Sequence, residues 1–275
     1  MTAGDVEVVR GSLNSRKAVA LDGTDDYVLA DAHAVARVAA NDTVGTYSAW
    51  IFLDTNNSES ITILSAGDND NTNEYFLFGK FSTGKIQAKL VHGGATQFDV
   101  RATNEVLTAK KWYHVAVVQT GTRCNLYLDG KIIAMTDNVA TDLTFWYDEL
   151  TLTDKFAIGV TESNGTHTGD WSGMISDVKY WDLALTADQI LTDYKNLTAD
   201  PEVTAHLQFH IDFDEDATDA GLGADDGTPT GHAYLCGWGS EWSRQIELNA
   251  LVADTFESLS YDSAGIMTTL IMKAA

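Results

Sequence analysis

The stretch NLYLDGKIIA, residues 125–134, contains two apolar runs separated by Asp129 and Gly130. An Asp-Gly pair readily adopts the positive φ angles that the turn of a two-residue β-hairpin requires. The segment before it, WYHVAVV at residues 112–118, has the alternating or continuous apolar residues found in strands of a two-layer sheet. Together the two segments predict a hairpin next to another strand, and they favour an all-β fold.

Similar strand patterns extend along much of the chain. They predict strands at residues 17–21, 26–30, 46–54, 60–65, 74–79, 84–91, 96–101, 155–160 and 173–181. A helix is predicted over residues 186–196, where Thr186 and Gln189 match the reciprocal capping pattern, and a shorter helix over residues 32–40. Roughly a dozen short strands with turns between them predict an all-β sandwich with a helix at one edge.

A late strand is predicted over residues 205–216, where Leu207, Phe209 and Ile211 share one phase of an apolar–polar alternation. Such a half-buried strand needs the core of the preceding sandwich, so we expect it to return and complete the sheet. The predicted organisation is therefore an N-terminal arm, a sandwich that includes the late strand, and a C-terminal extension for docking or oligomerisation. Their bounds are residues 1–14, 15–235 and 236–275.

Composition limits the partners of the chain. The 275 residues include 17 Lys plus Arg against 40 Asp plus Glu, which gives a formal net charge of −23. No stretch combines clustered basic residues with aromatic ones, so we expect no nucleic-acid partner. The N-terminal sequence lacks the pattern of a signal peptide, and no segment approaches the run of about 20 apolar residues that crosses a bilayer, so we expect no membrane insertion.

Six segments occur in an order and spacing that resemble laminin-G-like and pentraxin-like domains of the concanavalin A-like superfamily. They are ALDGTDDYV (20–28), YSAWIFLD (47–54), ILSAGD (63–68), KKWYHVAVV (110–118), LYLDGKII (126–133) and WSGMISDVKYWDLALTADQI (171–190). The resemblance covers about residues 15–196 and implies a two-sheet antiparallel jelly-roll sandwich with one short helix and a C-terminal extension. In such domains LDGTDDYV is a turn between two strands, in which Asp22 and Gly23 form the bend.

The resemblance also implies calcium, because laminin-G-like and pentraxin-like domains often hold this ion at one rim of the sandwich through oxygen ligands. The matching loops are GDNDNTNE (67–74) and ESNGTHTGD (162–170). Their candidate ligands are Asp68, Asp70, Asn73, Glu162 and Asp170. The second loop lacks most of the acidic run of pentraxins, so ordinary polar loops remain the alternative.

A carbohydrate site would need exposed aromatic rings beside polar groups, since the apolar face of a sugar stacks on a ring. The candidate ligand-binding residues are Trp146 and Tyr147 in the loop LTFWYDEL, and Trp171 near the predicted calcium rim. Packing in the core is the alternative for each of these side chains.

Glycoside hydrolases of the same superfamily use two carboxylates about 5 to 10 Å apart. The best candidate pair is Asp212 and Asp214 in HIDFDE, residues 210–215, because both face one side of the strand. The hydrolase motif begins with a catalytic Glu, whereas this sequence has His210 in that place. We therefore predict no catalytic residues and no enzymatic activity.

The order of segments suggests where the protein works. Residues 209–231 resemble a segment that precedes the LDG turn in many laminin-G-like domains, but here it follows the helix, as in proteins on tailed-phage particles. This resemblance implies a non-enzymatic structural protein on the virion surface, as a capsid decoration or a tail-associated subunit with weak glycan binding. An extracellular, calcium-dependent lectin or adhesin is the alternative.

The expected partners are other virion or lattice proteins, further copies of the chain, and surface glycans. The final stretch GIMTTLIMKAA is apolar on both faces, and such a terminus usually docks on its own domain or on a neighbouring subunit. The predicted assembly residues are Ile266, Met267, Leu270, Ile271 and Met272.

Overall fold

The computed structural model describes residues 17–55, 58–197, 199–213, 221, 226–230, 234–237, 256–261 and 267–272. The chain divides into two compact units. One unit spans Lys17–Leu235 and contains the β-sandwich, and the other groups Met1–Arg16 with Cys236–Ala275. Within the described residues, no helix is both long and apolar enough to span a membrane.

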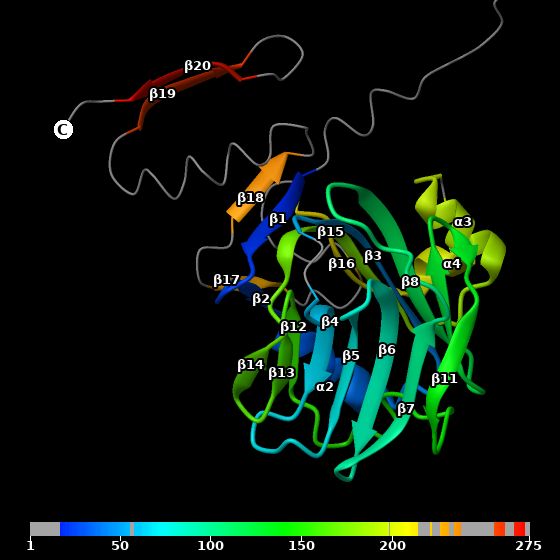
Figure 1. The fold of residues 1–275 in the computed structure, drawn as a ribbon. Helices are drawn as coiled ribbons and strands as arrows, with labels where there is room; N and C mark the ends of the chain where they lie inside the picture. The colour runs from blue at the N-terminus through cyan, green and yellow to red at the C-terminus, as the bar shows by residue number, and fades with distance from the viewer. Residues whose placement is uncertain are drawn as a thin grey trace, which may run out of the picture. The chain divides into compact units, whose positions relative to one another are not determined.

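Sheet 1 of the sandwich has the strand order β10-β9-β8-β3-β15-β1-β18, and β16 also pairs with β15 (Figure 1). Its strands are β1 (Lys17–Asp22), β3 (Gly45–Leu53), β8 (Trp112–Gln119), β9 (Cys124–Leu128), β10 (Lys131–Ile132), β15 (Ser172–Trp181), β16 (Leu207–Ile211) and β18 (Tyr234–Gly237). One edge of β15 pairs with β3. The other edge is shared by β1 and β16, which pair antiparallel with its first and second halves.

Sheet 2 has the strand order β11-β7-β6-β5-β4-β12-β2-β17. Its strands are β2 (Tyr27–Leu29), β4 (Ile61–Gly67), β5 (Tyr75–Phe81), β6 (Lys85–His92), β7 (Ala95–Ala102), β11 (Met135–Ala140), β12 (Lys155–Ile158) and β17 (Thr228–Thr230). Two separate hairpins pair β13 (Thr161–Ser163) with β14 (Thr166–Thr168), and β19 (Phe256–Tyr261) with β20 (Met267–Met272). The predicted all-β, two-sheet antiparallel sandwich is confirmed.

The main core lies between the two sheets, because alternate residues of each strand face the other sheet. From β3 the buried side chains include Tyr47 and Ile51, and from β5 they include Phe76 and Phe78. The intervening residues of these strands face outward. This alternation determines which side chains are available to a ligand on the outer surface of each sheet.

Local turn chemistry positions the strands as the sequence predicts. Asp129 and Gly130 have φ angles of 48° and 73°, which fits the predicted two-residue turn between β9 and β10. Strands are present at each of the predicted positions, and β16 confirms the late strand by pairing with β15. The strands that were not predicted include β11, β13 and β14, and the last two replace part of an expected loop.

Three helices are described: α2 (Asp31–Ala40), α3 (Ala187–Tyr194) and α4 (Pro201–Ala205). Helix α3 begins with the predicted capping box, in which the Thr186 side chain accepts from the Gln189 backbone and the Gln189 side chain accepts from the Thr186 backbone. Ile190 of α3 packs in a second apolar cluster with Val118 and Trp181 on the outer face of sheet 1. This helix therefore covers part of the outer face of sheet 1.

Candidate binding site

A groove with a volume of about 700 Å³ lies on the outer face of sheet 2. Its lining residues are Ser60, Ile61, Thr62, Thr72, Tyr75, Leu77, Lys80, Gln87, Lys89, Val91, Gly94, Thr96, Thr161, Ser163, Thr166, Thr168 and Gly169. Strands β4, β5, β6 and β7 supply one side of it, and the β13–β14 hairpin supplies the other.

Strand alternation places the floor of the groove. On β6 the side chains of Ile86, Ala88 and Leu90 are buried in the core, which leaves Gln87 and Lys89 on the outer face. On β5 the same rule turns Tyr75 and Leu77 outward, and Leu77 pairs directly with Lys89 across the sheet. Side chains from neighbouring strands are thus brought together on one surface.

The β13–β14 hairpin forms a wall with many hydroxyl groups. Asn164 and Gly165 at its tip have φ angles of 57° and 61°, which is the backbone conformation of a tight two-residue turn. At its base, the Thr161 and Thr62 hydroxyls are 2.6 Å apart, and the Thr62 backbone N–H donates to Gly169 at 2.8 Å. These bonds fix the hairpin to β4 and hold its hydroxyl groups over the groove.

Two lysines give the groove a positive charge. Lys89 Nζ donates to Tyr75 Oη at 2.8 Å, and Lys80 Nζ donates to the Glu59 carbonyl at 2.7 Å. Burial lowers the pKa of Lys80, and the nearby Glu59 carboxylate opposes that shift. Among the described residues that line the groove, none is Asp or Glu.

An ion pair supports the floor from the side. Arg101 Nε donates to Asp99 Oδ1 at 2.9 Å, and Gln87 Nε2 donates to the same oxygen at 2.8 Å. The Arg101 guanidinium also lies 3.6 Å from the ring centroid of Phe81. Because these contacts satisfy Asp99 within the sheet, the carboxylate is neutralised by its neighbours and Gln87 is held in place beside the groove.

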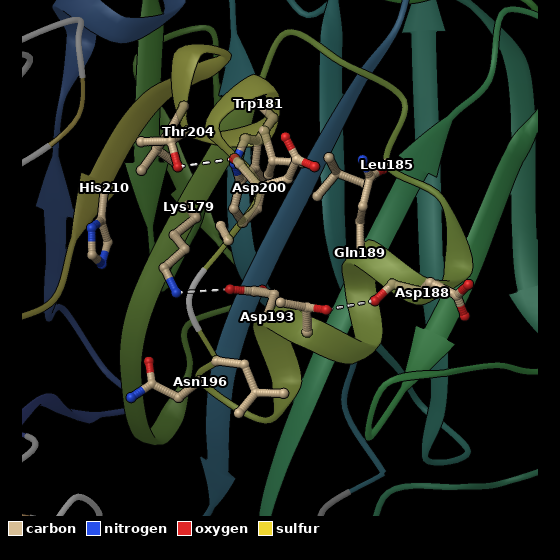
Figure 2. A pocket seen from close by; sticks show the side chains of 15 residues that line it. Lys179, Trp181, Leu185, Asp188, Gln189, Asp193, Asn196, Asp200, Thr204 and His210 are labelled. Carbon is tan, nitrogen blue, oxygen red and sulfur yellow. Dashed lines mark hydrogen bonds and ion pairs between the residues drawn. The ribbon is translucent and has the colours of Figure 1, made fainter.

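A second cavity of about 520 Å³ lies over sheet 1, between α3, α4, β15 and β16 (Figure 2). Lys179, Asp193 and His210 lie in its lining, together with Asp188 and Asp200. The lining therefore contains more acidic than basic groups.

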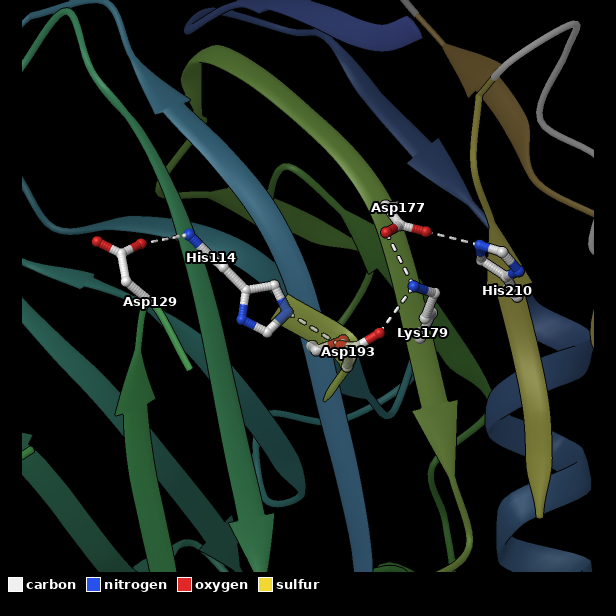
Figure 3. A network of polar contacts seen from close by, with 7 residues as sticks. His114, Asp129, Asp177, Lys179, Asp193 and His210 are labelled. Atoms are coloured by element: carbon white, nitrogen blue, oxygen red, sulfur yellow. Dashed lines mark hydrogen bonds and ion pairs between the residues drawn. The ribbon is translucent and has the colours of Figure 1, made fainter. Parts of the chain in front are cut away.

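Lys179, Asp193 and His210 of this cavity belong to a network that fastens α3 to sheet 1 (Figure 3). Lys179 Nζ donates to Asp177 and to Asp193, each at 2.8 Å. Asp193 also lies 3.0 Å from His114 Nε2, and Asp177 lies 2.7 Å from His210 Nε2. Burial would lower the pKa of Lys179, but the two carboxylates raise it above its ordinary value, so the lysine stays charged. The network satisfies its own charges, which indicates a structural role.

The predicted calcium ligands do not form one set. Asp68 and Asp70 belong to a local turn in which the Asp70 N–H donates to Asp68 Oδ1 at 2.8 Å. The Glu162 carboxylate is buried and pairs with His167, and burial raises its pKa against the effect of that histidine. Burial raises the pKa of the Asp170 carboxyl, and the like charges of Asp22 and Asp25 raise it further. Asn73 lies by Gly94, next to the groove.

Among the described residues, Asp22, Asp25 and Asp26 do converge, and each offers an oxygen within 4.8 Å of the others. They belong to LDGTDDYV and form the predicted turn, because the Thr24 N–H donates to Asp22 at 2.8 Å and the Asp22 N–H donates to Asp26 at 2.9 Å. Carboxylate oxygens are the ligand type that calcium prefers. The chemistry of this turn therefore fits calcium better than the five predicted residues do.

The structure corrects the predicted sugar-stacking residues. Trp146 and Tyr147 are each 1% exposed and Trp171 is 0% exposed, so none presents a ring face at the surface. Trp146 Nε1 donates to Tyr180 Oη, and Trp171 Nε1 donates to the Phe52 carbonyl. Aromatic residues of loops are buried here because they fill the ends of the core between the two sheets. The core-packing alternative holds for all three.

The candidate hydrolase pair and the predicted assembly residues lie partly outside the described parts of the chain. Asp212 is described, but Asp214 lies outside the described residues, as does Ile266. Met267, Leu270, Ile271 and Met272 fall in β20, which pairs antiparallel with β19. The described part of the terminal stretch predicted to dock is therefore a strand of a hairpin.

Sequence reasoning missed the groove. The sequence did contain a sign of the groove, because polar residues such as Gln87 and Lys89 occupy the outward positions of β6. The sequence analysis interpreted these segments only as strands. Which of these positions share a surface depends on strand pairing and on the β13–β14 hairpin, and neither is encoded in a short segment.

Comparisons with known proteins define the class. The model of a laminin G domain family, described as the Concanavalin A-like lectin/glucanases superfamily, matches residues 22–191. The chain therefore belongs to this superfamily. A search of curated proteins found no match.

Several solved structures share the fold. The CBM40 domain of the Ruminococcus gnavus IT-sialidase bound to α2,3-sialyllactose is 17% identical with a TM-score of 0.54, covering 66% of this chain and 99% of its own. A protein from Bacteroides ovatus named as a candidate carbohydrate-binding protein is 20% identical with a TM-score of 0.53, covering 81% and 60%. A heptameric SAP-like pentraxin from Limulus polyphemus is 16% identical with a TM-score of 0.50, covering 80% and 94%. These neighbours are carbohydrate-binding modules and a pentraxin.

Proposed function

We propose that the protein is a non-enzymatic carbohydrate-binding module that holds a glycan in the groove on sheet 2. The observation that carries this proposal is the lining of the groove, where hydroxyl, amide and ammonium groups surround Tyr75 and Leu77. Structural neighbours with the same fold, one of them bound to sialyllactose, support the same class of ligand.

The groove offers the contacts that a sugar needs. Sugar hydroxyls both donate and accept hydrogen bonds, and the Thr and Ser side chains of the β13–β14 hairpin can do either. Gln87 and Lys89 add donors from the opposite side. Tyr75 supplies a ring against which the apolar face of a sugar can pack. Because the described lining has no carboxylate, it lacks the acid–base pair of a glycoside hydrolase, which supports binding without hydrolysis.

A glycan array probed with the full-length protein tests the proposal. We expect binding to a subset of glycans, and we expect Tyr75→Ala to weaken it about tenfold by removing the ring at the groove. Tyr194→Ala is the matched control, because Tyr194 is also a half-buried tyrosine but lies on α3, outside the groove lining. Absence of binding to every glycan, or equal loss in both variants at equal folded fraction, would contradict the proposal.

Calcium dependence is proposed alongside glycan binding, with Asp22, Asp25 and Asp26 as the groups that would hold the ion. Bound calcium would neutralise these carboxylates and stabilise the turn between β1 and β2. Adding calcium to chelator-treated protein should raise its melting temperature, and Asp25→Asn should remove that shift. The exposed Asp188→Asn is the charge-matched control. An unchanged melting temperature in the wild type would exclude a calcium site in the fold.

A second proposal concerns attachment to a virion or a similar lattice. Its support is the separate unit that contains the β19–β20 hairpin, together with the apolar residues of β20. The virion-surface location itself stays a prediction from the order of segments. Deletion of residues 265–275 removes β20, and we expect it to reduce the assembled mass measured by light scattering to that of a folded monomer. Assembly that survives the deletion would count against this attachment.

A further inference from the structure

The charge of the groove is opposite to that of the chain. The protein carries a net charge of −23, yet the described lining of the groove contains Lys80 and Lys89 and no acidic residue. By contrast, the cavity over sheet 1 is lined by Asp188, Asp193 and Asp200 with Lys179. Salt screens the repulsion between an anion and the distant negative charges of the protein. A positive site on such an acidic protein can therefore still attract an anion at short range.

Lys89 is the cation of the groove that is available to a ligand. Its Nζ donates to the neutral Tyr75 hydroxyl and lies 5.2 Å from the centroid of that ring. Among the described residues it forms no ion pair with a carboxylate, whereas Arg101 is paired with Asp99 and Lys155 with Asp31. An ammonium group has three N–H donors. Lys89 can therefore direct further donors at an acceptor on a ligand.

Lys80 has a different environment. It is 2% exposed, its Nζ donates to the Glu59 carbonyl, and the Glu59 carboxylate offsets part of its charge. Lys89 pairs across the sheet with Leu77, which is three residues before Lys80 on β5. With a rise of about 3.3 Å per residue, the two lysines are attached roughly 10 Å apart. An anionic group of a ligand would thus be recognised at the Lys89 end of the groove.

Ring stacking contributes less than charge to the selection of a sugar in this groove. Tyr75 is the only aromatic residue in its described lining, and its hydroxyl is already engaged by Lys89. A neutral sugar would gain hydrogen bonds but only one ring contact. A sugar with a negative charge would gain, in addition, a charge-assisted hydrogen bond to Lys89.

We infer that the groove selects glycans that carry a negatively charged group, a carboxylate or a sulfate ester, and that Lys89 determines this selectivity. The inference rests on the proposed function and adds the class of sugar to it. A charge-assisted hydrogen bond is about twice as strong as a neutral one, which corresponds to roughly tenfold tighter binding of the acidic sugar.

Titration calorimetry on the full-length protein can test the selectivity with lactose, 3′-sialyllactose and 3′-sulfated lactose. Lactose is the neutral counterpart, and the two acidic probes separate carboxylate from sulfate. We expect at least one acidic probe to bind about tenfold more tightly than lactose at 50 mM NaCl, and the difference to shrink at 500 mM NaCl. Lys89→Gln should reduce the preference to about twofold or less, and Lys89→Arg should restore most of it.

Lys131→Gln is the matched control, because it removes the same charge at an exposed position on sheet 1. It should leave the preference for the acidic probe unchanged. A preference that persists in Lys89→Gln at an unchanged melting temperature would overturn the inference. Equal affinity for neutral and acidic sugars would overturn it while leaving glycan binding intact, as would binding only to neutral glycans on the array. Failure to bind any glycan would overturn both.

Discussion

Asp193 shows how one side chain can join a helix to a sheet. It projects from α3 and accepts hydrogen bonds from Ser48 at 2.7 Å and from Lys179 at 2.8 Å, and it lies 3.0 Å from His114. These three partners come from β3, β15 and β8, which are adjacent strands of sheet 1. The position of α3 is therefore specified by a buried polar contact as well as by the apolar packing of Ile190.

Replacing this carboxylate should destabilise the protein. In Asp193→Asn, Lys179 keeps only Asp177 as a charged partner and His114 loses its own, so we expect a loss of about 3 kcal/mol in the free energy of unfolding. Chemical denaturation measures this change. The control is Asp188→Asn, an exposed position on the same helix, for which we expect less than about 1 kcal/mol. Equal effects of the two substitutions would show that the network contributes no specific stability.

Lowering the pH should remove the stability that the Asp193 carboxylate provides. Burial would raise the pKa of Asp193, but Lys179 and His114 hold it below its ordinary value. A carboxyl group whose pKa is lower in the folded than in the unfolded state stabilises the fold above its unfolded pKa of about 4. That contribution is lost as the pH falls through the folded pKa. The free energy of unfolding should therefore fall more steeply below about pH 4 in the wild type than in Asp193→Asn, and parallel pH profiles would contradict this assignment.

At the scale of the element, α3 is short and depends on its ends and on the sheet beneath it. It has eight residues, which is too short for an isolated helix to be stable in water. The Thr186–Gln189 capping box satisfies backbone N–H groups at its start, and Ile190 is buried on the side that faces sheet 1. The cap and the packing together keep the helix folded.

Removing the cap should therefore have a measurable but limited effect. Thr186→Ala removes the hydroxyl that accepts from the Gln189 N–H, and we expect it to lower the free energy of unfolding by about 1 kcal/mol. The exposed Thr151→Ala serves as the control, with an expected change within about 0.5 kcal/mol. Faster amide exchange confined to α3 would show that the loss is local. An unchanged stability of Thr186→Ala would argue that packing alone fixes the start of the helix.

At the scale of the whole molecule, the net charge of −23 opposes the folded state, because like charges lie closer together in a compact chain than in an unfolded one. Ion pairs such as Lys155 with Asp31 and Arg123 with Asp137 offset this repulsion only where a cation is available. The 17 basic residues cannot neutralise the 40 acidic ones.

Salt should consequently stabilise the protein. Raising NaCl from about 20 to 500 mM shortens the Debye length from roughly 20 Å to less than 5 Å and screens the repulsion. We expect the melting temperature to rise by several degrees, as measured by circular dichroism. Near the isoelectric point of about 4.3 the net charge vanishes, so the same increase in salt should have much less effect there. A melting temperature that falls with salt at neutral pH would show that ion pairs outweigh the repulsion.

Most of the fold was predictable because its signals are local. The Asp129–Gly130 turn, the Thr186–Gln189 cap and the alternation of β3 and β16 each depend on a few adjacent residues. The binding site was less predictable. The burial of Trp146 and Trp171 is decided by the packing of distant strands, and the groove depends on the pairing of β5 with β6 and on a hairpin that was interpreted as a loop. A short segment contains no information about these long-range contacts.

The sharing of one edge of β15 by β1 and β16 has a consequence for synthesis. During translation, β1 and β15 leave the ribosome before β16, so the half of β15 from Val178 to Trp181 has no partner on that edge until Ile211 has emerged. An unpaired strand edge is a template for pairing with other chains. Nascent or prematurely terminated chains that end before β16 would therefore be the forms most prone to aggregate, and cellular quality control would have to act on them rather than on the completed protein.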